Sequence, residues 1–135
     1  MLTLLLFALI VACILAAIAT EASAGGMVQI RSSSGRTATV AASAAASFRC
    51  LIGKLEAAGY RIDFMGGWRR HGSVPRSKHP AGLAIDINQT ARNRVTRAFP
   101  KGTNAMAASC GLKHGAVWRD ADGGHFEVVG RRGGS

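Results

Sequence analysis

The chain has 135 residues, of which 17 are basic and seven are acidic, so its formal net charge is +10. This length allows one small domain with a modest core and leaves no room for a second domain. The positive charge favours contact with anionic polymers, either nucleic acid or an anionic cell envelope.

The N-terminal residues indicate an export signal. Residues 2–19 are almost wholly apolar, and Ala22-Ser23-Ala24 has the small-x-small pattern that a signal peptidase cuts. We therefore expect residues 1–24 to be a signal peptide and the protein to be exported, either periplasmic or secreted. No basic residue precedes the apolar run, so a membrane anchor formed by residues 2–19 stays open, as does, with less support, a lipoprotein modified at Cys13. Export makes the envelope a better partner than nucleic acid, which is not expected.

Cleavage after residue 24 leaves 111 residues, of which 17 are basic and six are acidic, giving a net charge of +11. Residues 25–40 are small, polar and unpatterned, and they are predicted to be a flexible leader or an edge segment before a domain over 41–135. Cys50 and Cys110 remain, and an even cysteine count in an exported chain indicates one disulfide. Two buried free thiols are the alternative. We expect a monomer.

A core helix is predicted over residues 41–58, because four large apolar residues recur there at helical spacing before Gly59, which suits a left-handed cap. These residues are Phe48, Leu51, Ile52 and Leu55. Residues 60–65 then alternate, with Ile62 and Phe64 on one face, as expected of a half-buried strand.

Residues 68–80 have neither helical nor strand periodicity and are predicted to be a loop. The strand predicted next, over 83–87, has an apolar face and a second face that carries Ala84 and Asp86. The apolar face consists of Leu83, Ile85 and Ile87.

Short helices are predicted over 90–98 and 104–108, because a Pro and a Gly separate them. A last strand is predicted over 126–129. These elements predict an α+β fold in which a small antiparallel sheet packs against a few helices.

Three side chains form a candidate metal site. His79 precedes a Pro-Ala-Gly turn that leads into the strand carrying Asp86, so the turn can bring the two side chains together. The small Ala84 on the same strand face leaves space for a metal ion and a water. His125 follows two glycines, which allow close backbone packing. Zinc hydrolases use three such ligands and keep one position open for water, so we predict zinc at His79, Asp86 and His125.

Two motifs carry a resemblance to a known family. Residues 77–86, SKHPAGLAID, match S-x-H-x-x-G-x-A-x-D in every specified position, and residues 122–127, DGGHFE, have an acidic residue three positions before a histidine. In both, the chain resembles the zinc peptidases that include D-alanyl-D-alanine carboxypeptidases, dipeptidases and L-alanyl-D-glutamate endopeptidases, whose fold Hedgehog signalling domains share. The resemblance runs from about residue 48 to 129. It implies a Hedgehog/DD-peptidase-like fold and hydrolysis of peptidoglycan stem peptides.

The resemblance also implies roles for single residues. His79, Asp86 and His125 correspond to the zinc ligands, and Asp122 corresponds to the general base on the water. Glu127 is the alternative base, because it shares a strand face with His125.

The segment Gly66-Gly67-Trp68-Arg69 resembles the family segment whose arginine faces the scissile bond. This implies that Arg69 stabilises the oxyanion of the tetrahedral intermediate, whereas the alternative is a solvated basic loop. Ser77 is a candidate for binding a substrate terminus. His71 and His114 have no counterpart in the motifs and are predicted to be loop residues.

The bond that is cut stays open between an L-Ala-D-Glu endopeptidase and a D-Ala-D-Ala carboxypeptidase. Little chain lies outside the predicted core to close a cleft, which favours the endopeptidase. The alternative function is a non-catalytic, zinc-stabilised cell-wall-binding module of the same fold. A secreted basic protein that binds nucleic acid is predicted by the charge alone.

Overall fold

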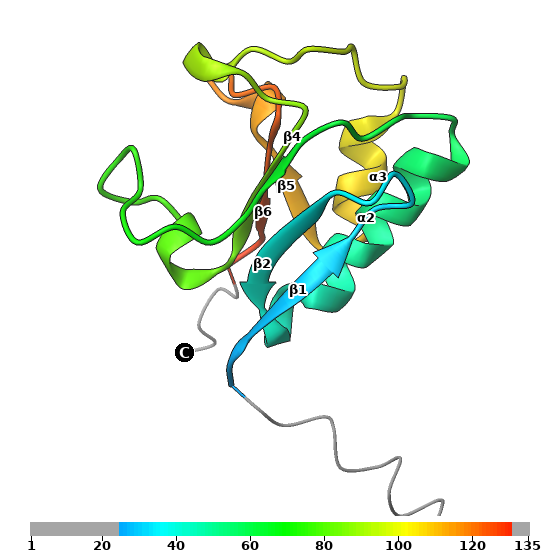
Figure 1. Ribbon diagram of the computed structural model, residues 1–135. Coiled ribbons are helices and arrows are strands. Elements are labelled where there is room, and N and C mark those ends of the chain that lie inside the picture. The colour runs from blue at the N-terminus through cyan, green and yellow to red at the C-terminus, as the bar shows by residue number, and fades with distance from the viewer. Residues whose placement is uncertain (1–24, 131–135) are drawn as a thin grey trace, which may run out of the picture.

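The computed structural model describes residues 25–130 (Figure 1). The predicted signal segment, residues 1–24, lies outside the described residues. Within the described part, no helix is long and apolar enough to cross a membrane.

Residues 25–130 form an α+β fold with two small antiparallel sheets and two α-helices, as the sequence predicts at this level. A hairpin forms the first sheet, and the second has four strands in the order β3-β4-β6-β5. The strands are β1 (Met27–Arg31), β2 (Thr37–Ala41), β3 (Met65–Gly66), β4 (Ala84–Ile87), β5 (Leu112–His114) and β6 (His125–Val128). The helices are α2 (Ala45–Ala57) and α3 (Thr103–Ser109), with 3-10 turns at Ala42–Ala44, His79–Ala81, Ala91–Asn93 and Gly115–Val117.

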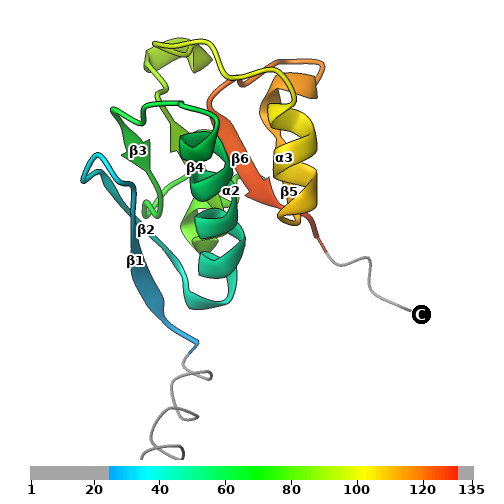
Figure 2. The ribbon, with the colours of Figure 1, turned by 90° about the vertical axis from the view of Figure 1, so that its right-hand side faces the viewer.

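The core lies between the helices and one face of the four-stranded sheet, and Figure 2 shows α2 and α3 on the same side of this sheet. Helix α2 follows the predicted spacing, and its large apolar side chains are fully buried. They pack with Ile85 and Ile87 of β4 and Phe126 of β6. A disulfide joins Cys50 on α2 to Cys110 at the end of α3.

The prediction of a flexible leader over 25–40 is wrong, because these residues form the β1–β2 hairpin. Ile30 pairs with Ala38, and Val28 pairs with Val40. The side chains of Ile30 and Val40 are 1% and 0% exposed. The polar residues alternate with these apolar ones, and the two strands are short, so the apolar pattern is weak in the sequence.

The predicted strand over 60–65 is mostly irregular, and only its last residue enters β3. The side chain of Asn88 takes the place of a neighbouring strand: its Oδ1 accepts hydrogen bonds from the backbone N–H groups of Asp63 (2.7 Å) and Phe64 (3.0 Å). The segment therefore does not alternate to its end, and Phe64 is 48% exposed instead of facing the core.

The predicted helix over 90–98 is also wrong. Only the 3-10 turn Ala91–Asn93 forms, because the chain folds back so that Gln89 bridges Val95. The Thr90 hydroxyl donates to the carbonyl of Arg94 (3.1 Å), which is local pairing that competes with helix formation. The helix predicted over 104–108 and the last strand are confirmed as α3 and β6, whereas the three-residue β5 is too short to show a period.

Candidate metal centre

Strands β4 and β6 hold two of the predicted ligands. Asp86 of β4 lies directly opposite His125 of β6 in the antiparallel register, which places their Cβ atoms about 5 Å apart. Their neighbours Ile85 and Phe126 point to the core, so both ligands lie on the other face. The predicted parity of β4 is confirmed.

The turn that carries His79 is fixed by Gly82. Gly82 has a left-handed backbone (φ 69°), and a Cβ at this position would lie 2.5 Å from the backbone nitrogen of Ala41. That nitrogen donates a hydrogen bond to the Gly82 carbonyl (2.9 Å). The glycine of the sequence motif is therefore needed for its conformation and for close contact with β2, which holds the turn in place.

The three predicted ligands meet on this face of the sheet. His79 Nε2 lies 3.2 Å and His125 Nδ1 lies 3.0 Å from Asp86 Oδ1, and one ligand atom from each residue lies within 4.8 Å of the others. All three side chains are buried. Two ligands bound about 2.1 Å from one tetrahedral zinc ion lie about 3.4 Å apart, so these separations suit a metal ion.

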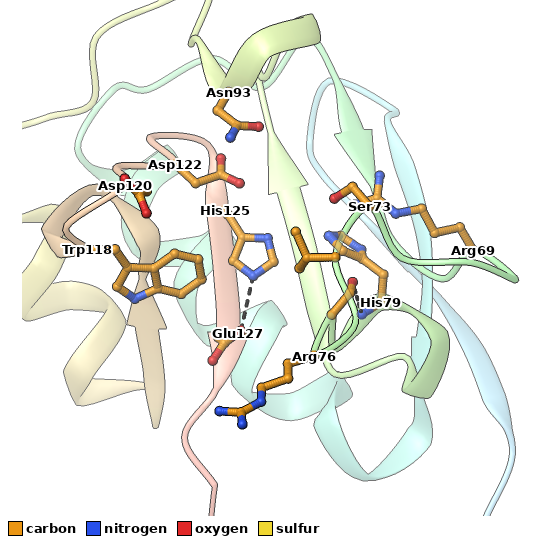
Figure 3. A pocket seen from close by; sticks show the side chains of 12 residues that line it. Arg69, Ser73, Arg76, His79, Asn93, Trp118, Asp120, Asp122, His125 and Glu127 are labelled. Carbon is orange, nitrogen blue, oxygen red and sulfur yellow. Dashed lines mark hydrogen bonds and ion pairs between the residues drawn. The ribbon is translucent and has the colours of Figure 1, made fainter.

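The hydrogen bonds behind the two imidazoles fix which nitrogen faces the centre. His79 Nδ1 donates to the carbonyl of Gly67 (2.8 Å), and His125 Nε2 donates to the carboxylate of Glu127 (3.2 Å; dashed in Figure 3). In the neutral form, each ring held in this way presents the lone pair of its other nitrogen on the side of Asp86 Oδ1. His79 Nε2 is buried and has no hydrogen-bond partner among the described residues. A cation among these atoms would satisfy all three, and the outer hydrogen bonds are of the kind that orients metal-binding histidines.

The charges of this cluster are strongly coupled. Burial alone would raise the pKa of Asp86, but the imidazoles of His125 and His79 hold that pKa well below its usual range. Burial would lower the pKa of His125, but the hydrogen bond and charge of Asp86 raise it. The carboxylate of Asp86 thus stabilises the protonated form of His125 relative to its neutral form.

The two candidate base residues have different surroundings. Glu127 accepts from His125 and forms an ion pair with Lys78 (3.1 Å) on the side of the imidazole away from Asp86. Asp122 Oδ1 is buried without a hydrogen-bond partner among the described residues. Asp122 lines the same cleft as His79 and His125 and the same hollow as Asp86, so it lies beside the ligands. Burial raises its pKa.

A cleft of about 350 Å³ opens over His79 and His125 (Figure 3). In this view Asp122 and Asn93 lie above His125, Arg76 and Glu127 lie below it, and Trp118 forms one side. Arg69, Asn93 and Asp122 also border a second hollow of about 320 Å³ that extends past Phe64 and Thr90. The open space therefore continues on both sides of the metal centre.

The structure brings the other predicted site residues to this cleft. The Arg69 guanidinium lies 3.6 Å from Asp86 Oδ2 and is 46% exposed, so it borders the space above the ligands. Ser77 lines the same cleft. His71 does not line it but borders a shallow hollow in the preceding loop.

Sequence reasoning missed three residues. Lys78 occupies an unspecified position of the motif, yet it supports Glu127 and also donates to the carbonyl of Val128 (2.6 Å). Trp118 lines the cleft and lies 5.1 Å from the His125 ring between centroids. His114 is not a loop residue, because it ends β5 and is buried. Its position in a three-residue strand gave no periodic signal.

Comparison with known proteins identifies no relative: the chain matches no family model, no curated protein and no solved structure. The class of this protein is therefore described from its fold and its site alone. The protein is a small α+β protein with a buried group of two histidines and one carboxylate that could bind a metal ion.

Proposed function

We propose that the protein is a zinc metallopeptidase that hydrolyses amide bonds in peptidoglycan stem peptides. The observation that carries the proposal is the convergence of His79 Nε2, His125 Nδ1 and Asp86 Oδ1 where two adjoining hollows meet, the first lined by the two histidines and the second by Asp86. Two imidazoles and one carboxylate are a common ligand set of catalytic zinc, which keeps a fourth position for water. The motif resemblance to cell-wall peptidases with a Hedgehog/DD-peptidase-like fold supports the same reaction.

The side chains around the ligands suit amide hydrolysis. Zinc, when bound, lowers the pKa of a coordinated water to about 7 and polarises the substrate carbonyl. Asp122 accepts the proton of the attacking water and passes it to the leaving amine. Arg69 faces the same space and stabilises the negative charge that develops on the carbonyl oxygen. Glu127 keeps the His125 ring in the orientation that presents Nδ1.

The open cleft favours an endopeptidase over a carboxypeptidase. An internal bond needs room for the peptide on both sides of the reacting carbonyl, and the hollows beside Trp118 and beside Phe64 meet at Asp122. Ser77 lines the first of these hollows and is suited to bind a polar group of the peptide.

The proposed location is the periplasm or the exterior, after removal of residues 1–24. The disulfide between Cys50 and Cys110 supports an oxidising compartment. Sequencing the N-terminus of the protein recovered from cells tests this, because a start at residue 1 would favour the anchor formed by residues 2–19.

Mass spectrometry of purified cell wall digested by the zinc-loaded protein tests the activity. We expect new peptide termini that identify one bond, no products after chelation, and no products from the Asp122→Ala variant. Full zinc occupancy without any product would contradict the enzyme and support the non-catalytic wall-binding module. Binding to nucleic acid that is steeply salt-dependent and needs no zinc would support the third reading.

A further inference from the structure

His114 is a buried polar residue that the proposed reaction does not use. It lies at the end of β5 opposite Phe126 in the register, so it is on the core face of the sheet, away from the metal ligands. Its ring stacks on Phe126, with 4.3 Å between centroids and 8° between planes, and Phe99 packs edge-on against it. An imidazole buried among aromatic rings needs partners for both nitrogens.

Both nitrogens of His114 have partners, and they come from two different parts of the chain. Nε2 lies 2.6 Å from the carbonyl oxygen of Gly123, so it donates to that oxygen. Nδ1 lies 2.5 Å from Oδ1 of the Asn104 side-chain amide on α3. A neutral ring that donates from Nε2 accepts at Nδ1, so the amide turned by 180° supplies the donating NH₂ group there. Burial lowers the pKa of His114, which favours the neutral ring. The ring therefore ties the residue after Asp122 to the helix layer.

The backbone around Asp122 is held on every side. Asp122 N–H donates to the carbonyl of Gly115 (3.0 Å), and His125 N–H donates to the carbonyl of Asp122 (3.2 Å). A Cβ on Gly115 would lie 2.6 Å from the Asp122 carbonyl oxygen, so the loop is in close contact with the end of β5. Gly124 accepts from Ile87 N–H (2.8 Å).

The carboxylate itself has no comparable anchor, because Asp122 Oδ1 makes no hydrogen bond within the described residues. Its position therefore depends on the backbone of the loop over 119–124. One contact that fixes this backbone comes from a side chain outside the loop: the Nε2–H group of His114 donates a hydrogen bond to the carbonyl of Gly123.

We propose that His114 is a positioning residue that holds Gly123 and thereby places the Asp122 carboxylate over the metal centre. The inference rests on the proposed function for the role of Asp122, but the hydrogen bond and its effect on the loop do not. His114 touches neither the ligands nor the substrate cleft. Its loss should change the rate of the reaction without changing zinc binding.

The test uses His114→Phe, which keeps the stacked ring and removes both hydrogen bonds. Phe99→Leu is the matched control, because Phe99 packs against the same ring and makes no bond to the loop. Asn104→Ala is a milder variant on an exposed residue that removes only the partner of Nδ1. Zinc affinity, kcat and KM on wall peptides, and amide hydrogen exchange of residues 119–124 are measured for each protein.

We expect His114→Phe to keep zinc affinity and KM, to lower kcat about tenfold, the effect of about 1.4 kcal/mol, and to speed exchange across the loop. Asn104→Ala should show smaller changes of the same sign, and Phe99→Leu should lose stability while keeping kcat. Unchanged exchange in His114→Phe would overturn the inference, as would faster exchange with an unchanged kcat. If the wild-type protein has zinc but no turnover, the proposed function fails, and the exchange data alone decide whether His114 holds the loop.

Discussion

Glu127 shares its carboxylate between His125 and Lys78, whereas Asp122 keeps one buried oxygen without a partner among the described residues. A residue that already neutralises a lysine and orients a ligand is poorly placed to accept a proton from water. Of the two acidic residues that the motif offers as a base, the surroundings therefore favour Asp122.

Substitution of the two carboxylates should separate their tasks. Asp122→Asn should keep zinc and lower kcat by about 10²–10⁴, the usual contribution of a general base. Glu127→Gln should lower zinc affinity about 10- to 100-fold, as for other outer hydrogen-bond partners, and recover most of its activity at saturating zinc. Zinc titration and kcat are measured on both. A fully zinc-loaded Glu127→Gln without activity, beside an active Asp122→Asn, would reverse the assignment.

The Asp122 carboxylate should also lower the free energy of unfolding of the metal-free protein. Burial raises its pKa, so the folded state binds its proton more tightly than the unfolded state, and this contribution falls as pH rises through the folded pKa. Asp122→Asn should therefore raise the free energy of unfolding at pH 7 by less than about 1 kcal/mol, because Asp122 is only half-buried and solvent screens its charge. The gain should vanish toward pH 4, near the usual pKa of about 3.9. Denaturant unfolding at both pH values checks this, and a less stable Asn variant at pH 7 would contradict it.

The sequence predicts the three metal ligands better than it predicts the contacts of the residues around them. The spacing of His79 and Asp86 and the parity of β4 identify two ligands, and the second motif identifies His125. Which side of the His125 ring faces Asp86 depends on its rotamer and on Lys78, and neither has a sequence pattern. The roles of Asp122 and Glu127 therefore needed the structure.

The β1–β2 hairpin belongs to the site although it precedes both motifs. Thr39 O accepts from Trp68 N–H (2.7 Å), and a Cβ on Gly67 would lie 2.2 Å from Thr39 O. Strand β2 thus fixes the carbonyl of Gly67 that orients His79, and it also binds the turn at Gly82.

Deletion of the hairpin tests this role. The chain over 41–135 should lose its cooperative unfolding transition or at least 10-fold in zinc affinity, because it lacks a buried strand pair and the support of His79. The chain over 25–135 is the matched control. Thermal unfolding and zinc titration compare them. Equal stability and affinity would show that residues 25–40 are a leader after all.

The sequence predicts elements where a single period runs long enough. Helix α2 has four core residues at helical spacing, and β4 alternates over its whole length, so both are confirmed. In the hairpin, the few apolar residues are interspersed with serines and threonines, so the sequence shows no clear strand pattern. The conformations of residues 60–65 and 90–98 are set by local hydrogen bonds of the Asn88 and Thr90 side chains. The periodicity of the sequence does not reveal such bonds.

The molecule has a small apolar core and a strongly basic surface. The segments flanking the cleft carry Arg69, Arg76 and Arg119, while the acidic residues of the cleft are tied to the metal centre or lie beside it. This distribution favours approach to an anionic polymer such as the cell wall.

The charge predicts a salt effect that depends on the substrate. Hydrolysis of intact wall should slow as salt rises from about 0.01 M to 0.15 M, because the Debye length shortens from about 30 Å to 8 Å. Hydrolysis of a short neutral peptide should change little under the same conditions. Initial rates on the two substrates give the comparison. Equal salt dependence would show that long-range attraction to the wall is not involved.

Calorimetric titration of the metal-free protein with zinc tests whether His79, Asp86 and His125 form a zinc site. We expect the wild-type protein to bind one equivalent of zinc and Asp86→Ala to lose this binding, with Asp63→Ala as an acidic control away from the site. Absence of zinc binding, or binding that Asp86→Ala leaves unchanged, would show that these three residues do not form a zinc site.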